Sequence, residues 1–235
     1  MNEPDVMVYL MTGFLDSGKT GFLKFTLKQD YFQIDGKTLL ILCEDGEDEY
    51  DAMEMLRYGV VIERLEDREE LTEEYLAELD RKHEPDRVVI EYNGMWKVSD
   101  FENMKLPKGW GIEQKITTVD ASTFQTYLTN LKPLFVEMVR GAEMVLFNRC
   151  EDIKPLAGYR RSVKVVSPQA EVIFEDEQGE VENIFEDGEW AIMEWKDSLG
   201  LRGCGFFHVK DNKIVFQRGY WDKLSFLKQH NLPIE

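Results

Sequence analysis

The sequence predicts an α/β protein with a doubly wound, mostly parallel sheet flanked by helices, and with a small antiparallel β appendage near the carboxyl end. Two observations predict the sheet: short apolar runs recur along the first 175 residues, and helix-like segments separate them. A third observation predicts the appendage, because the pattern changes after an acidic stretch at 175–189. Alternation of strands and helices is typical of parallel sheets covered by helices.

The apolar runs lack strict alternation, as expected for strands that are buried on both faces. They occupy residues 6–11, 38–43, 59–65, 87–92, 115–120, 144–148 and 171–175. The segments between them include four with helical character, and Thr72 is placed to cap the second of these. The four segments are 18–30, 72–83, 121–140 and 154–165.

The carboxyl end has a different character. Its aromatic and apolar residues predict an antiparallel hairpin that turns at Asp211-Asn212, followed by a short helix at 223–230. We therefore expect two domains, the first at 1–182 and a β appendage at 183–235.

The composition argues against several classes of protein. The 235 residues carry 28 Lys and Arg against 46 Asp and Glu, and the formal net charge of −18 disfavours nucleic acid and anionic membranes while suiting metal ions or basic partners. Cys43, Cys150 and Cys204 are too dispersed for a disulfide framework or a zinc knuckle, which favours a reducing, cytoplasmic location. We expect no signal peptide and no membrane span, because the amino end is acidic and no run of about 18 apolar residues occurs.

The segment GFLDSGKT at 13–20 matches the phosphate-binding pattern G-x-x-x-x-G-K-[ST], and it lies between a predicted strand and a predicted helix. Gly13 and Gly18 permit a tight turn whose backbone N–H groups point inward, at the positive end of the helix. Lys19 would reach the β- and γ-phosphates, and Thr20 offers a hydroxyl to Mg²⁺. The residues expected to contact the nucleotide here are Gly13, Asp16, Ser17, Gly18, Lys19 and Thr20.

A nucleotide hydrolase also needs a carboxylate near the metal, at the end of a neighbouring buried strand. The segment RVVIEYNG supplies Glu91 at such a position, and Gly94 just beyond it would let the following loop move with the γ-phosphate. Glu91 would hold the metal or orient the attacking water. The alternative is an ordinary acidic residue at the carboxyl edge of the sheet, where ligands of open α/β sheets also bind.

The segment VLFNRCEDI predicts a loop that faces the base. Guanine-binding proteins use N-K-x-D, in which the Asp accepts both hydrogens of the guanine edge. Here Asn148 fits, Arg149 replaces Lys, and Glu151 stands at the Asp position with Asp152 one residue later. A polar loop between a strand and a helix is the alternative, since Asn and Asp favour turns and caps.

Four motifs in this order make residues 6 to 175 resemble the CobW/HypB/UreG group of P-loop GTPases, closest to CobW-like proteins. The motifs are TGFLDSGKT, VVIEYNGMW, TTVDASTF and VLFNRCEDI. The resemblance implies a SIMIBI-type P-loop NTPase fold, binding and slow hydrolysis of GTP with Mg²⁺, and a role in metal delivery or metallocentre assembly for a client metalloprotein, often as a homodimer. It also implies phosphate, Mg²⁺ and Walker-B roles for Lys19, Thr20 and Glu91, and base contacts from Asn148 with Glu151 or Asp152.

Two features depart from that family's pattern. Many CobW-like proteins carry a cysteine cluster after the second strand, whereas LCEDGEDEYD offers Cys43 and a run of acidic residues. Cys43, Glu44 and Glu47 could bind a transferred metal such as Zn²⁺ through mixed ligands, or Cys43 could be a buried strand residue beside a solvated loop. Gly21 stands where relatives often have a hydroxyl residue, which predicts a weaker grip on the α-phosphate.

The segment at 188–233 resembles a second family, the carboxyl half of SnoaL-like domains of the nuclear transport factor 2 fold. The helices that would close the pocket of such a domain have no counterpart in the sequence. We therefore interpret His208, Tyr220, Trp221 and Asp222 as hairpin and packing residues, because resemblance of fold does not carry function.

Three functions remain open on the sequence alone. The first is a Mg²⁺-dependent nucleotide hydrolase that acts as a switch or metallochaperone. The second is a P-loop small-molecule kinase, whose lid would need the paired arginines Arg160 and Arg161. The third is a module that binds nucleotide without hydrolysing it and dimerises through its tail.

Overall fold

The structure is a computed structural model that describes residues 4–44, 49–151, 153, 155–175, 180–196, 201–210 and 213–224. The chain divides into two compact units, Met1–Ile173 and Phe174–Glu235. The boundary that we expected at residue 182 lies later in the chain, within the first strand of the antiparallel sheet.

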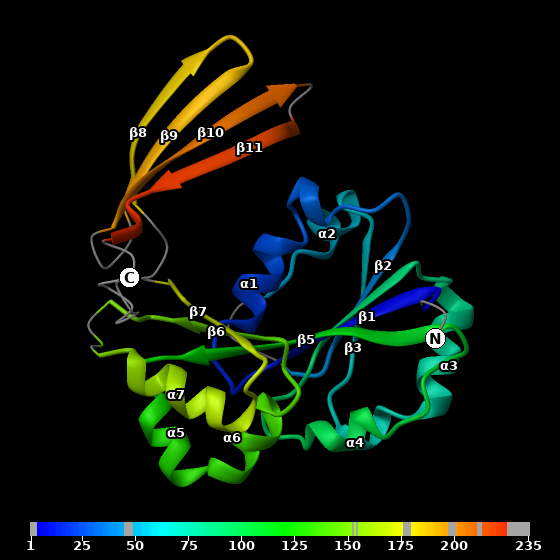
Figure 1. Cartoon of the computed structure of the whole chain (residues 1–235). Helices are drawn as coiled ribbons and strands as arrows, with labels where there is room; N and C mark the ends of the chain where they lie inside the picture. Colours follow the sequence, from blue (N-terminus) through cyan, green and yellow to red (C-terminus); the bar gives the residue numbers. More distant parts are fainter. Residues whose placement is uncertain are drawn as a thin grey trace. The chain divides into compact units, whose positions relative to one another are not determined.

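The first unit is built on a seven-stranded sheet with the order β3-β2-β4-β1-β5-β6-β7 (Figure 1). The pairings among β1 to β6 are all parallel. Each predicted apolar run forms a strand, so the predicted fold class is confirmed. The strands are β1 (Val6–Thr12), β2 (Thr38–Leu42), β3 (Val60–Arg64), β4 (Arg87–Glu91), β5 (Trp110–Asp120), β6 (Met144–Asn148) and β7 (Glu171–Phe174).

The register of this sheet brings distant motifs together. β1 lies between β4 and β5, with Met11 opposite Glu91 and Thr12 opposite Thr117. β6 follows β5 in the sheet and places Asn148 opposite Asp120. In parallel strands the carboxyl ends share one edge, which is where ligands of open α/β sheets bind. All the predicted motifs therefore meet at one edge.

Helices cover both faces of the sheet. The chain moves along the sheet in one direction from β1 to β3 and in the other from β3 to β7. With right-handed crossovers this reversal places α1 and α2 on one face and the later helices on the other, as Figure 1 shows. The helices are α1 (Lys19–Thr26), α2 (Ala52–Arg57), α3 (Glu73–His83), α4 (Val98–Glu102), α5 (Phe124–Asn130), α6 (Lys132–Val139) and α7 (Ala157–Val166), with 3-10 turns at Asp30–Phe32 and Arg68–Glu70.

Two predicted helices differ from the structure. The helix predicted over 121–140 is broken at Leu131, and Pro133 lies in the first turn of the new helix, where a missing N–H costs nothing. The helix predicted over 18–30 ends at Thr26, and a separate 3-10 turn begins at Asp30. The predicted cap of α3 is confirmed, because the Thr72 hydroxyl accepts a hydrogen bond from Tyr75 N at 3.1 Å.

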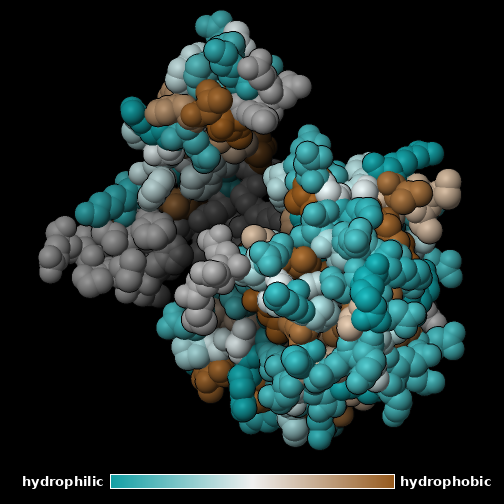
Figure 2. Space-filling model, turned by 90° about the vertical axis from the view of Figure 1, so that its right-hand side faces the viewer, coloured by the Kyte–Doolittle hydropathy of each residue, from teal (hydrophilic) through white to brown (hydrophobic). Residues whose placement is uncertain are grey.

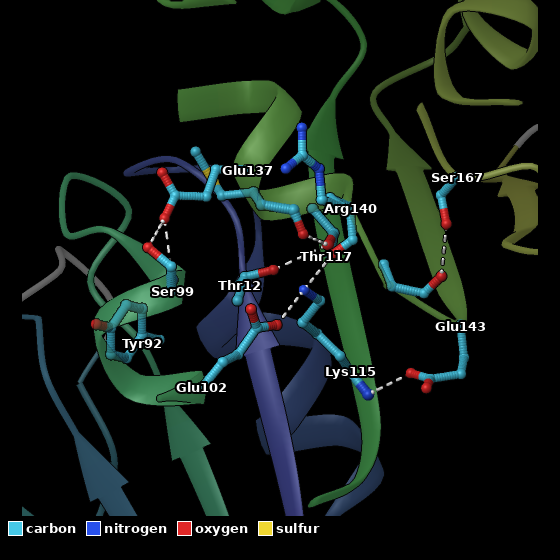
Figure 3. A network of polar contacts seen from close by, with 12 residues as sticks. Thr12, Tyr92, Ser99, Glu102, Lys115, Thr117, Glu137, Arg140, Glu143 and Ser167 are labelled. Atoms are coloured by element: carbon cyan, nitrogen blue, oxygen red, sulfur yellow. Dashed lines mark hydrogen bonds and ion pairs between the residues drawn. The ribbon is translucent and has the colours of Figure 1, made fainter. Parts of the chain in front are cut away.

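A polar network fixes the centre of the sheet against the helices below it (Figure 3). The Thr12 and Thr117 hydroxyls are 2.8 Å apart and join β1 to β5. Lys115, although almost fully buried, donates to Glu102 Oε1 at 2.6 Å and to the carbonyl of Arg140. The buried ammonium thus ties β5 to the end of α4 and to the end of α6.

The second unit is an antiparallel sheet in the order β11-β10-β9-β8. Its strands are β8 (Glu180–Asp187), β9 (Trp190–Lys196), β10 (Arg202–Lys210) and β11 (Lys213–Trp221). The predicted hairpin is confirmed by the pairing of β10 with β11, while its turn at Asp211-Asn212 and most of the predicted helix at 223–230 lie outside the described residues. The sequence predicts that the acidic segment 175–189 interrupts the pattern of strands, but β8 lies within it. The acidic residues of this segment hide the strand pattern.

The surfaces of the two units differ in character. Figure 2 shows mostly hydrophilic residues on the larger body, with scattered apolar ones, and a group of apolar residues among hydrophilic ones on the antiparallel sheet. Exposed side chains there include Ile184, Phe185, Trp190, Ile214, Tyr220 and Trp221. Trp190 stacks on His208 with ring centroids 4.5 Å apart, which agrees with the interpretation of His208 as a packing residue. None of the helices in the described ranges combines the length and the apolar character needed to cross a membrane.

Candidate functional site

The segment 13–20 forms a tight loop between β1 and the start of α1, as predicted. Gly13 has φ +144° and Gly18 has φ +90°, which are backbone conformations that residues with a Cβ rarely adopt. A Cβ on Gly13 would also lie 2.5 Å from Thr118 O. The backbone conformation therefore requires both glycines, and the close approach of β5 requires Gly13 as well.

Lys19 is buried inside this loop, with 3% of its surface exposed. Its ammonium donates to the carbonyls of Gly13 and Phe14, each at 2.9 Å. It also forms an ion pair of 2.5 Å with Glu44 Oε2, from the residue that follows Cys43 after β2. The loop thus curls around a fixed positive charge, and in this structure the anion beside that charge is a carboxylate of the chain itself.

Glu91 lies at the end of β4, beside the first turn of α1. The Thr20 hydroxyl donates to Glu91 Oε1 at 2.6 Å, and the Tyr50 hydroxyl donates to Oε2 at 2.5 Å. Burial raises the pKa of Glu91, against the opposing effect of these two hydrogen bonds and of nearby Lys19. Burial and the Glu91 carboxylate also raise the pKa of Tyr50, so its hydroxyl stays a donor.

The predicted base loop begins at the end of β6. Asn148 Nδ2 donates to Ser17 O at 2.9 Å, which joins this loop to the phosphate loop. Asn148 Oδ1 is buried and has no hydrogen-bond partner in the described structure. Glu151 is exposed, and Asp152 lies outside the described residues, so the choice between the two carboxylates stays open.

Arg149 bridges the two loops from the other side. It has φ +52°, and its guanidinium donates to Asp16 O at 2.9 Å and to Asp120 Oδ2 at 2.5 Å. Burial acts to raise the pKa of Asp120, but hydrogen bonds from Ser122 and Arg149 outweigh it and hold that pKa below its ordinary value. Asp16, at φ +58°, shares the left-handed conformation. The hydrogen bond to Asp16 O therefore joins the base loop to the phosphate loop, and the ion pair with Asp120 joins the base loop to the end of β5.

Gly94 packs directly on the phosphate loop. A Cβ there would collide with Gly13 O and would lie 2.7 Å from Phe14 Cα. The ring of Phe14 in turn stacks on Tyr127, with centroids 4.2 Å apart. We had assigned Gly94 to loop movement. In the structure its small size is needed for the contact between the loop after β4 and the phosphate loop.

Sequence reasoning missed Tyr50 and Asp120 as members of the site. Asp120 belongs to the quoted motif TTVDASTF, and its position at a strand end was a usable signal. Tyr50 had no such signal, because only the fold brings it to Glu91. Of the proposed lid arginines, Arg160 donates to Val172 O at 2.7 Å and ties α7 to β7.

The transferred-metal site proposed at Cys43, Glu44 and Glu47 is described only in part. Cys43 is fully buried, and burial together with Glu91 raises the pKa of its thiol. Glu44 pairs with Lys19, and Glu47 lies outside the described residues. Within the described ranges no three His, Cys, Asp or Glu side chains are grouped as metal ligands. This metal site stays a prediction.

These motifs and this fold have counterparts among known proteins. Residues 7–174 match the family model for the nucleotide-binding domain of CobW/HypB/UreG proteins. The chain belongs to the CobW/HypB/UreG family. No curated protein matches the sequence.

Two solved structures extend the comparison. The Zn(II)-bound YjiA GTPase from E. coli is similar over 94% of this chain and 90% of its own, with 17% identity and a TM-score of 0.54. The hydrogenase maturation factor HypB from Archaeoglobus fulgidus is similar over 72% of this chain and 81% of its own, with 16% identity and a TM-score of 0.48. At this identity the likeness to YjiA shows the fold alone.

The residues at the edge of this CobW/HypB/UreG domain fit a nucleotide and Mg²⁺. The glycines at positive φ open the loop, and the Lys19 ammonium already holds an anion. Asn148 Oδ1 is a buried acceptor that has no partner among the residues the structure describes. Thr20 and Glu91 present oxygen atoms side by side, which are the ligands that Mg²⁺ prefers.

Proposed function

We propose that this member of the CobW/HypB/UreG family binds GTP with Mg²⁺ and hydrolyses it slowly, as a cytoplasmic switch or metallochaperone in metal delivery or metallocentre assembly. The observation that carries the proposal is the grouping of Lys19, Thr20 and Glu91 at the mouth of the phosphate loop. Phosphoryl transfer in P-loop proteins uses a lysine, a hydroxyl residue and a carboxylate in these roles, and here Glu91 would supply the carboxylate.

Each residue has a distinct role in this proposal. Lys19 and the backbone N–H groups of the loop bind the β- and γ-phosphates, and Thr20 with Glu91 would hold Mg²⁺. When bound there, Mg²⁺ would supply positive charge to offset that of the phosphates and of the leaving oxygen. Glu91 would orient the attacking water from its buried position, while Tyr50 keeps the carboxylate from rotating.

Base selection rests on the loop after β6. Asn148 fixes that loop to the phosphate loop, and Glu151 or Asp152 would accept from the guanine edge. We expect a modest preference for GTP over ATP if Glu151 serves, because its side chain is one methylene longer than Asp. A misplaced charged hydrogen bond gives up about 1.5–3 kcal/mol, or about ten-fold or more in discrimination. If Asp152 serves, the preference is strong and Asp152→Asn removes it.

A competition titration tests this proposal. The four common nucleoside triphosphates are added with Mg²⁺ against a fluorescent GTP analogue, and phosphate release is followed in parallel. We expect GTP to compete best and Lys19→Ala to lose binding. Displacement of GTP by an equal concentration of ATP would count against guanine recognition, and binding without phosphate release would favour a non-hydrolysing module.

The metal-handling part of the proposal rests on family membership and on the acidic loop after β2. The structural neighbour YjiA is a Zn(II)-bound protein, and Cys43 with Glu44 and Glu47 are the candidate ligands here. Zinc titration of the wild type and of Cys43→Ala tests it: equal affinity in the two proteins would move the transferred metal elsewhere.

A further inference from the structure

The phosphate loop carries an internal anion. Glu44 Oε2 lies 2.5 Å from Lys19 Nζ, and the side chains of the two residues are only 9% and 3% exposed. In the proposed function, that ammonium is the group that binds the β- and γ-phosphates. A carboxylate and a phosphate oxygen are alternative partners for the same charge, and both form short charge-assisted hydrogen bonds with it.

We propose that Glu44 is a built-in competitor of the nucleotide, which occupies the phosphate position on Lys19 in the free protein and must leave when a triphosphate binds. This inference rests on the proposed function, because it assumes that Lys19 is the phosphate-binding lysine. It deepens that function by naming the group that regulates access to the site.

The position of Glu44 in the chain couples this exchange to the acidic loop. Glu44 directly follows the buried Cys43, and at the other end of the loop Tyr50 donates to Glu91 Oε2 at 2.5 Å. Glu44 thus contacts the phosphate-binding lysine, and Tyr50 contacts the Glu91 carboxylate. Displacement of Glu44 by phosphate breaks the first contact and leaves the second.

Loss of the Glu44 carboxylate should have opposite effects on two measured quantities: it should lower the stability of the free protein and raise the affinity for nucleotide. The ion pair neutralises Lys19, whose buried ammonium otherwise has two carbonyl partners among the described residues, so loss of the pair destabilises the free protein. The same loss favours nucleotide binding. In the wild type the ion pair must break before a phosphate can contact Lys19, and in the variant that free-energy cost is absent. If Glu44 holds Lys19 for at least about nine-tenths of the time, its removal tightens binding at least about ten-fold.

The experiment compares Glu44→Gln with a matched control, Glu49→Gln. Both variants remove one negative charge from the same loop, but the Glu49 side chain is exposed and its contact to Lys24 uses the backbone carbonyl. Affinity for the non-hydrolysable analogue β,γ-imido-GTP with Mg²⁺ is measured by calorimetry, and the thermal midpoint is measured without nucleotide. Glu44→Asp is a second variant, because it keeps the charge and withdraws the carboxylate from Lys19.

We expect Glu44→Gln to bind the analogue at least about ten-fold more tightly than wild type and to melt at a lower temperature when free. Glu44→Asp should change in the same directions, and Glu49→Gln should do neither. Equal affinities in Glu44→Gln and Glu49→Gln would overturn the inference while leaving the proposed function intact. If neither the wild type nor any variant binds the analogue, the proposed function is overturned. If Glu44→Gln and Glu49→Gln have equal thermal midpoints without nucleotide, the Lys19–Glu44 ion pair does not stabilise the free protein, and the inference fails on that ground alone.

Discussion

The Thr20 hydroxyl donates to Glu91 Oε1 over 2.6 Å, and this bond joins the first turn of α1 to the end of β4 across 71 positions of sequence. The second oxygen of the same carboxylate accepts from Tyr50. Glu91 is therefore held on both sides, in a buried position beside the phosphate loop. In the proposed function the two oxygen-bearing residues of this bond are the ones that would meet Mg²⁺.

The first prediction concerns Glu91→Gln. The amide keeps the shape of the side chain and can still pair with both hydroxyls, but it loses the charge that favours the metal and its water. We expect nucleotide binding to be nearly retained and hydrolysis to fall by about 10²-fold or more, the size of effect of a positioned acid–base group. Single-turnover phosphate release at saturating GTP measures it, and unchanged turnover would assign the catalytic role to another residue.

The second prediction concerns pH. Because burial raises the pKa of Glu91, the folded chain holds that proton more tightly than the unfolded chain. Stability from this group is therefore highest below the ordinary carboxyl pKa of about 4.3 and falls as pH rises through the raised pKa. As pH rises from about 4.3 through the raised pKa of Glu91, the wild type should therefore lose thermal stability relative to Glu91→Gln, which has no carboxyl group there. Thermal melts of the two proteins across this pH range measure the difference. A difference that stays constant with pH would contradict the raised pKa.

The third prediction concerns the pair of Lys19 and Glu44. From the sequence alone, Lys19→Ala is expected to fold normally, since Ala favours helices. The structure adds a cost, because the substitution leaves the carboxylate of Glu44 mostly buried and without its ammonium, and breaking such a pair costs up to about 3–5 kcal/mol. We expect a lowered midpoint in chemical denaturation for Lys19→Ala.

The double variant Lys19→Ala/Glu44→Gln serves as the control. It removes both charges, so most of the lost stability should return, while triphosphate binding stays lost because no ammonium remains. Additive destabilisation in the double variant would show that the two side chains do not interact.

The parts of the fold that the sequence predicted share a physical cause. The seven strands of the first unit were readable because buried parallel strands are apolar on both faces, and the loop at 13–20 was readable because its geometry restricts residue types at fixed spacing. β8 was missed because acidic residues interrupt its apolar side chains, such as Ile184 and Phe185. The break at Leu131 was missed because helical periodicity continues across it.

The site was predictable only where a motif is contiguous. Lys19, Thr20 and Glu91 each lie at a recognisable strand end or helix start. Tyr50 and Glu44 contact them through the path of a loop, and no local pattern reports such a contact. The partners of a buried charge depend on tertiary structure, so the sequence indicated the charge of Lys19 and not the carboxylate that neutralises it.

The last prediction compares two glycines, Gly94 and Gly21, that differ in their surroundings. A Cβ on Gly94 would collide with Gly13 O and crowd Phe14 Cα at 2.7 Å, and these backbone atoms cannot yield without moving the phosphate loop. We expect Gly94→Ala to destabilise the protein by about 1–3 kcal/mol, as overpacking does, and to weaken triphosphate binding.

Gly21, by contrast, is an exposed residue of α1, and a Cβ there would meet no atom within 4 Å. Gly21→Ala should raise stability by up to about 1 kcal/mol through helix propensity, without loss of nucleotide affinity. Denaturant unfolding and calorimetric titration of the two variants provide the comparison, and a Gly94→Ala protein that matches Gly21→Ala in both measurements would show that the loop after β4 does not support the phosphate loop.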